Sequence, residues 1–232
     1  MKRSKTNNVV FLIECIVYSI CLIAFLILGL SGTVTTQAAN IIYCSFIILS
    51  FGYWFILEFI FKKYDNAVHC KMFAKYYIPT RKSNAAHKRK GIAAVIALWI
   101  FYLLFAALLK STGVLNWYVF LIGACIMFIL NSFFVRKKCL LSILFLHNKN
   151  DCCKNCGING WDHAIFSSAL FFAPELSTAA AIINLTIIAL SVVLLIMWEV
   201  NYHNHPERFY PETNKSLGCA HCLKQCKYRD NR

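Results

Sequence analysis

The sequence predicts an all-α fold, a polytopic bundle of transmembrane helices with about six membrane segments in three hairpins. Two observations lead to this fold class: the apolar residues are gathered in long blocks, and the basic residues are confined to alternate connections between them. The 232-residue chain is 59% hydrophobic with a mean hydropathy of +0.58. That composition is too apolar for a water-soluble domain of this length.

Five blocks have the length of a membrane crossing. They are residues 9–30, 41–61, 91–109, 118–135 and 178–198. A hydrocarbon core of about 30 Å is crossed by about 20 apolar residues in a helix, and continuous runs without strict alternation favour helices over strands. The first block is longer than the apolar stretch of about 7–15 residues in a signal peptide, so we interpret it as a transmembrane helix rather than a cleaved leader.

The distribution of positive charge predicts the orientation of the segments. The formal net charge is +14, and Lys and Arg fall before residue 6 and within 62–90, 136–154 and 208–232, with Lys110 as the exception. Basic residues are enriched in cytoplasmic connections of membrane proteins. We therefore expect a multi-pass protein of the plasma membrane with both termini cytoplasmic and with connections 31–40 and 110–117 outside.

The connection 62–90 is the most basic part of the chain, with nine Lys or Arg against the single acid Asp65. Next to a membrane, such a segment is expected to associate with anionic lipid headgroups. The bilayer is thus the first expected partner, followed by another protein or a second copy of the chain. Since the charge follows the topology, we do not expect nucleic acid to be a partner.

Residues 161–177 are apolar but interrupted by Pro174 and Glu175. As a helix this segment would reach only about 25 Å. Two interpretations remain open, a short tilted crossing or a re-entrant segment. If it crosses, it pairs with 178–198 as a third hairpin whose apex lies near Pro174 and Glu175.

Two C-x-x-C pairs stand out among the twelve cysteines and predict a metal site. A two-residue spacer lets both thiolates of a turn face one ion, and four thiolates around one ion form the closed site of structural zinc. The pattern resembles a zinc ribbon in general form only, and we expect a small cytoplasmic zinc-ribbon-like clasp. The expected ligands of Zn²⁺ are Cys153, Cys156, Cys219 and Cys222.

Two other uses of these cysteines remain open: four thiolates also hold iron–sulfur clusters, and a C-x-x-C pair also serves thiol redox chemistry. Disulfides are disfavoured because the expected location is cytoplasmic. The zinc interpretation also requires that an even number of crossings separate Cys156 from Cys219. It therefore requires that 161–177 cross the membrane.

Several polar residues lie within or beside the apolar blocks. Glu14 and Glu58 lie near the inner boundary, where we expect them to snorkel toward basic residues, with an ion or proton relay as the alternative. Asn131 and Asn184 are expected to form hydrogen bonds between helices. We expect Asp162 to cap the helix that follows it, and His163 to be solvated. We expect three aromatic residues to anchor the protein at the membrane interface: Trp161, Trp198 and Tyr202. Residues 205–211 are expected to form an ordered, non-helical link.

No catalytic motif is recognisable in the sequence, so an enzymatic activity is not expected. We divide the chain into residues 1–145, two transmembrane hairpins with basic inner loops, and 146–232, a third hairpin flanked by the two C-x-x-C pairs. The expected function is a non-catalytic scaffold or partner-binding subunit. The alternatives are a membrane redox protein that uses the cysteines and a small transporter or channel that uses Glu14 and Glu58.

Overall fold

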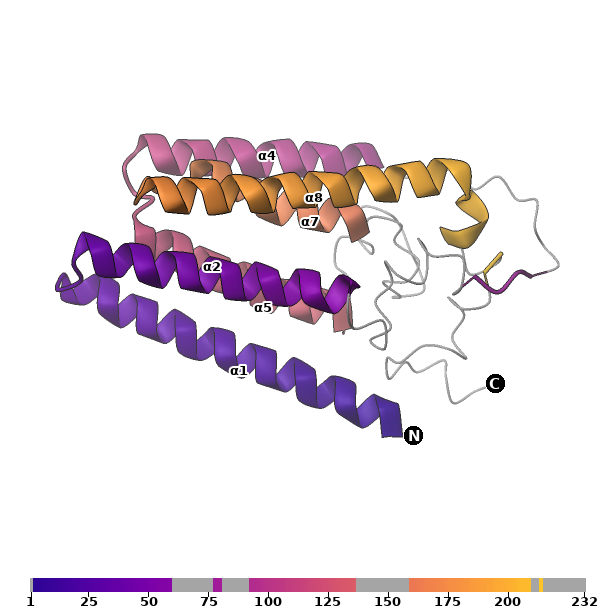
Figure 1. The fold of residues 1–232 in the computed structure, drawn as a ribbon, viewed down its shortest axis with the longest axis horizontal. Coiled ribbons are helices and arrows are strands. Elements are labelled where there is room, and N and C mark those ends of the chain that lie inside the picture. The colour runs from indigo at the N-terminus through magenta and orange to yellow at the C-terminus, as the bar shows by residue number, and fades with distance from the viewer. Residues whose placement is uncertain (1, 60–76, 81–91, 137–158, 210–212, 215–232) are drawn as a thin grey trace.

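The computed structural model describes residues 2–59, 77–80, 92–136, 159–209 and 213–214, and this part of the chain is almost entirely helical (Figure 1). The elements are α1 (Lys2–Ser31), α2 (Thr36–Phe59), α4 (Ile92–Ser111), α5 (Trp117–Arg136), α7 (Asn159–Ser168), the 3₁₀ helix η3 (Ala169–Phe172), α8 (Thr178–Asn204) and the 3₁₀ helix η4 (Pro206–Phe209). These ranges contain no strand, only an isolated β-bridge between Pro79 and Asn214. The predicted all-α class is confirmed.

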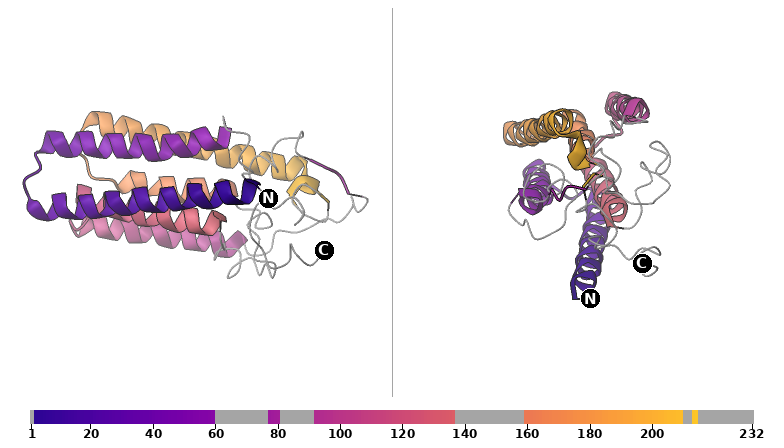
Figure 2. Two further views of the ribbon diagram at one scale, coloured as in Figure 1. Left: turned by 90° about the horizontal axis from the view of Figure 1, so that it is seen from below. Right: turned by 90° about the vertical axis from the view of Figure 1, so that its right-hand side faces the viewer.

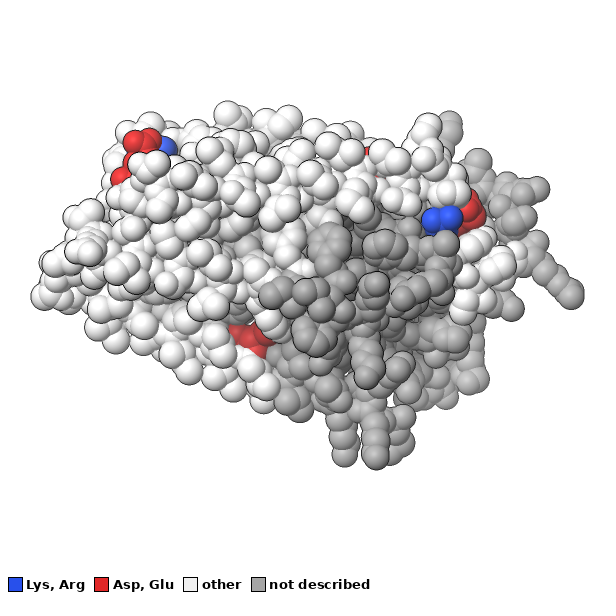
Figure 3. Space-filling view, in the orientation of Figure 1, with Lys and Arg blue, Asp and Glu red and all other residues white. Residues whose placement is uncertain are grey.

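Among the described residues, three helices are long and apolar enough to cross a membrane: Phe11–Ser31 of α1, Ile92–Ser111 of α4 and Thr178–Asn204 of α8. A shorter apolar helix, Trp117–Phe133, lies within α5. Large apolar side chains are exposed along α1, α4 and α8, and the face drawn in Figure 3 carries few charged atoms over the helices. Water does not favour such a surface, whereas lipid does, so the chain is a membrane protein. The count of six membrane segments stays a prediction.

The helices lie side by side along one axis, and the short connections between them gather at one end of the bundle (Figures 1 and 2). We call this the turn end; it holds residues 32–35, 112–116 and 173–177. Gly32 and Gly113 have φ values of 63° and 72°, a conformation that glycine adopts without a steric cost. The opposite end, which we call the terminal end, holds the start of α1 and all of η4.

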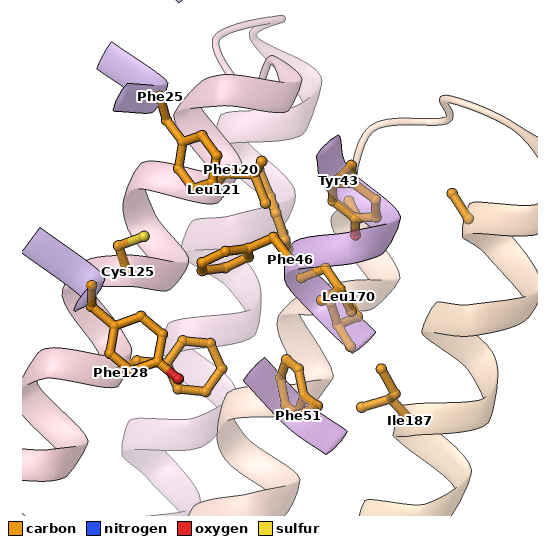
Figure 4. Close-up of a cluster of buried hydrophobic side chains, with 14 of the residues drawn as sticks. Phe25, Tyr43, Phe46, Phe51, Phe120, Leu121, Cys125, Phe128, Leu170 and Ile187 are labelled. Carbon is orange, nitrogen blue, oxygen red and sulfur yellow. The ribbon is translucent and has the colours of Figure 1, made fainter. Parts of the chain in front are cut away.

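Helices that follow one another in the chain are not always those that pack together. Among the described helices, α1 packs most extensively against α5 and α7 against α8, while α2 contacts α8 and α5, and α4 contacts η3. An aromatic core fills the space between α1, α2 and α5 (Figure 4). Tyr18 stacks on Phe128 with ring centroids 5.1 Å apart, and Phe25 meets Phe46 edge to face at 5.1 Å. These rings join α1 to α2 and α5 across the bundle.

Residues 159–177 run the length of the bundle from the terminal end to the turn end (Figure 1). At the turn end, Lys110 Nζ lies 3.5 Å from Glu175 Oε1, and Ser177 Oγ donates to Asn40 Oδ1 at 2.5 Å. The segment therefore arrives beside the other connections, as an apex near Pro174 and Glu175 requires. The expected cap at Asp162 is wrong: α7 begins at Asn159 and places Asp162 in its first turn.

Candidate functional site

The four expected zinc ligands, Cys153, Cys156, Cys219 and Cys222, lie outside the described residues. Within the part of the chain that the structure describes, no three His, Cys, Asp or Glu residues are grouped so that they could hold a metal ion. The structure does describe the chain on either side of the two cysteine clusters. Asn159 follows the first cluster closely, and Asn214 precedes the second.

The start of α7 and the end of α8 lie side by side at the terminal end. The indole N–H of Trp161 donates to Glu199 Oε1 at 2.8 Å, and a charged acceptor makes such a bond stronger than a neutral one. The Trp161 ring also meets Trp99 of α4 edge to face, with centroids 5.7 Å apart. This indole therefore fixes the position of α7 against both α8 and α4.

Beyond α8 the chain turns back through η4. Trp198 and Phe209 are 0% and 1% exposed, and their rings meet edge to face with centroids 4.9 Å apart. Tyr202 adds a second ring contact with Phe209 at 5.0 Å. The expectation that the link 205–211 is non-helical was wrong for its described part, because residues 206–209 form a 3₁₀ helix; residues 210 and 211 lie outside the described residues. Trp198 packs inside the protein instead of serving as an interfacial anchor.

Two completely buried polar residues follow this turn and bind a distant segment. Thr213 and Asn214 are 1% and 0% exposed. Within the tail, Thr213 Oγ1 donates to the Glu207 carbonyl at 2.5 Å and Asn214 Nδ2 donates to the Arg208 carbonyl at 2.8 Å. We refer to residues 205–209 with 213–214 as the tail cap.

The tail cap binds the segment 77–80, which belongs to the connection between α2 and α4. The Ile78 N–H donates to Asn214 Oδ1 at 3.2 Å, and the Thr80 N–H donates to the Thr213 carbonyl at 3.1 Å. Sequence reasoning missed this contact. Its only signal was a short uncharged stretch, including Pro79, between basic residues.

A second polar site lies among α1, α2 and α5. Glu14 is 8% exposed; its Oε1 accepts from Tyr53 Oη at 2.9 Å and its Oε2 accepts from Ser132 Oγ at 2.8 Å. The expectation that Glu14 snorkels to the boundary is therefore wrong, while its expected pairing with Arg3, Lys5, Lys62 or Lys63 involves side chains outside the described set. In an apolar bundle a carboxylate requires donors, and two hydroxyl groups supply them. The side chain of Glu58 lies outside the described set.

The remaining predictions have mixed outcomes. Asn184 of α8 accepts a hydrogen bond from Tyr43 Oη of α2 at 2.9 Å, which confirms its predicted role between helices. Asn131 is buried. His163 is 3% exposed and stacks on Phe55, so the expectation of a solvated side chain is wrong. The sequence gives no period that distinguishes a buried from an exposed histidine at the start of so short a helix.

Comparison of the chain with protein families, with curated proteins and with solved structures finds no match.

Proposed function

We propose that the chain is a non-catalytic membrane scaffold or partner-binding subunit whose cytoplasmic face is ordered by a structural zinc ion. In this proposal six membrane segments form three hairpins in the plasma membrane, with both termini cytoplasmic. The ion is held by Cys153, Cys156, Cys219 and Cys222. The observation that supports it best is the hydrogen bond from Trp161 to Glu199, because it joins the chain flanking the two cysteine pairs at one end of the bundle.

Chain length limits how far the two pairs lie from their anchors. Cys156 is three residues from Asn159, and Cys219 is five residues from Asn214. At about 3.3–3.6 Å per residue, these stretches reach at most about 11 Å and 18 Å. The contacts of Trp198 with Phe209 and of Trp161 with Glu199 hold both anchors at the terminal end. A shared tetrahedral ion requires the two anchors to lie within the summed reach of these stretches.

Polar contacts between the helices support a structural role for the bundle. Tyr43 binds Asn184, while Tyr53 and Ser132 bind Glu14, so these polar side chains hold helices together. Zinc ligation would add folding free energy at the terminal end, since metal affinity for the folded chain stabilises it. The basic inner loops would contact anionic headgroups, and a protein partner or a second copy would use the ordered face.

Metal analysis of the purified full-length protein tests the zinc site. We expect about one zinc ion per chain, and we expect Cys153→Ser and Cys222→Ser to lose most of it. Cys44→Ser is the matched control, because Cys44 lies within α2 and donates to Asn40 of the same helix. Full zinc occupancy in either ligand variant would contradict four-cysteine ligation. A coloured protein that contains iron would favour the redox alternative.

Thiol labelling in intact cells tests the topology independently. A membrane-impermeant reagent that modified Cys219 or Cys222 from outside, while Cys153 and Cys156 stayed unmodified, would exclude a shared ion.

A small transporter or channel is the second candidate, and buried Glu14 is the observation that favours it. An ionisable side chain inside a membrane bundle is a candidate for ion or proton transfer. This alternative predicts that Glu14→Gln or Glu58→Gln abolishes ion or proton flux in proteoliposomes while metal content stays unchanged. If Glu14 only joins helices, Glu14→Gln lowers the stability of the protein and leaves no flux to abolish.

A further inference from the structure

We infer that the tail cap is a latch that couples the metal site to the connection between α2 and α4. The inference rests on the proposed zinc site and adds its regulation: metal binding and docking of residues 77–80 strengthen each other. The contact that carries the coupling is the one between the segment 77–80 and the pair Thr213–Asn214.

The contact between the tail cap and segment 77–80 is made by specific, buried hydrogen bonds. Asn214 is 0% exposed and uses both ends of its side-chain amide: Oδ1 accepts from the Ile78 N–H, and Nδ2 donates to the Arg208 carbonyl. A buried amide with both ends bonded has a fixed orientation, and breaking either bond leaves a buried polar group unsatisfied. The docked segment is therefore held in one register.

Covalent connection links this contact to the metal site. Asn214 precedes Cys219 by five residues, so a tail fixed at Cys219 by the ion keeps Asn214 near its docking position. Tethering at a second point raises the effective concentration of the first contact. The coupling between two binding events is reciprocal, so docking must raise zinc affinity by the same factor by which zinc favours docking.

The same connection has a consequence for the basic loop. Arg81 and Lys82 directly follow Thr80, and Lys75 precedes Tyr77 by two residues. When the latch is closed, segment 77–80 is fixed at the terminal end, and with it the point from which these basic residues extend. Zinc would thus control where the positive charge of the 62–90 connection meets anionic headgroups.

Amide hydrogen exchange on the full-length protein in lipid nanodiscs tests the latch. Because Pro79 has no N–H, the segment 77–80 carries only the amides of Tyr77, Ile78 and Thr80, and the last two are the latch donors. We expect exchange at these amides to speed up by roughly two- to tenfold when zinc is removed with a chelator, the range expected for losing one net hydrogen bond. Zinc added back alone should restore protection.

Variants at position 214 separate the latch from general loss of structure. Asn214→Ala should release Ile78 and weaken zinc affinity by the same factor, whereas Asn214→Asp keeps the Oδ1 acceptor and should keep more of the protection at Ile78. Asn201→Ala is the control, because the Asn201 side-chain amide donates to the Met197 carbonyl of the same helix at 2.8 Å. It should leave exchange at 78 and 80 unchanged.

Three results would overturn the inference, and they can be told apart. Wild-type exchange in Asn214→Ala would mean that the contact does not hold the segment. Zinc binding that is unaffected by Asn214→Ala, together with protection that survives chelation, would leave the zinc site intact and remove the coupling. A protein without zinc would remove the proposed function as well.

Discussion

The two ends of the bundle are held by different kinds of contact. At the turn end the ion pair between Lys110 and Glu175 is solvent-accessible, with side chains 40% and 90% exposed, and the hydrogen bond between Ser177 and Asn40 is only partly buried. At the terminal end they are buried, with Trp198 and Asn214 at 0% exposure. Water competes for exposed charges but cannot replace a buried bond, so the terminal end should contribute far more to stability.

This difference shows where the chain needs specific side chains. Both ends join segments that are far apart in sequence: Asn40 and Ser177 at the turn end are 137 residues apart, and Ile78 and Asn214 at the terminal end are 136 residues apart. At the turn end, short connections also join α1 to α2, α4 to α5 and η3 to α8, so less of the binding there depends on side chains. Loop closure over such a distance carries an entropic cost, which buried rings and hydrogen bonds offset.

Phe209→Ala should have the largest effect of the substitutions considered for this comparison. The ring fills the space between Trp198 and Tyr202, and removing a buried Phe costs about 3–5 kcal/mol. We expect a clearly lower Tm in detergent. Phe171→Ala is the control, because Phe171 is 57% exposed and should give little change. Equal effects of the two substitutions would contradict the difference between the ends.

Glu14→Ala should come next, at about 2–4 kcal/mol. The substitution removes the acceptor of both the Tyr53 and the Ser132 hydroxyl groups, and each such bond between membrane helices contributes about 1–2 kcal/mol. Thermal unfolding in detergent measures the loss. Glu14→Gln keeps one carbonyl acceptor and should lose about half as much; a Gln variant as unstable as the Ala variant would mean that charge, not hydrogen bonding, matters most.

Gly29→Ala tests packing at the turn end and should cost about 1–3 kcal/mol. A Cβ at Gly29 would overlap the ring of Tyr118, so α1 and α5 would have to separate or the ring would have to move. Gly52→Ala and Gly123→Ala are matched controls, since a Cβ at either position meets open space. Tyr118→Leu should reduce the penalty of Gly29→Ala; a purely additive double variant would show that the two residues do not interact.

Lys110→Ala should have the smallest effect, below about 1 kcal/mol, because solvent screens an exposed ion pair. Thermal unfolding in detergent measures this loss of stability, and high salt should remove the difference between the variant and the wild type. A loss of stability comparable with that of Phe209→Ala would show that the turn end is as important as the terminal end.

The sequence was sufficient for the features that depend on composition and period. Apolar blocks predicted the five long helices, although α1 begins seven residues before its block and α8 ends six residues after its block. Asn184 was identified as a polar contact because an amide in an apolar helix needs a partner. Pairing between distant segments was not predictable. The partners of Glu14 depend on which helices pack together, and nothing in the sequence around Tyr53 or Ser132 indicates that they bind this residue. The docking of 77–80 on Asn214 likewise arises only from tertiary structure.

The pairing of α1 with α5 has a consequence for biosynthesis. Helices leave the ribosome in order, yet Ser132, which binds Glu14, is made 118 residues later. After insertion α1 therefore waits in the bilayer, with its partner face open to lipid or to insertion factors, until α5 emerges. A nascent chain stalled before residue 117 would lack that partner helix, whereas one stalled soon after residue 136 would already contain it.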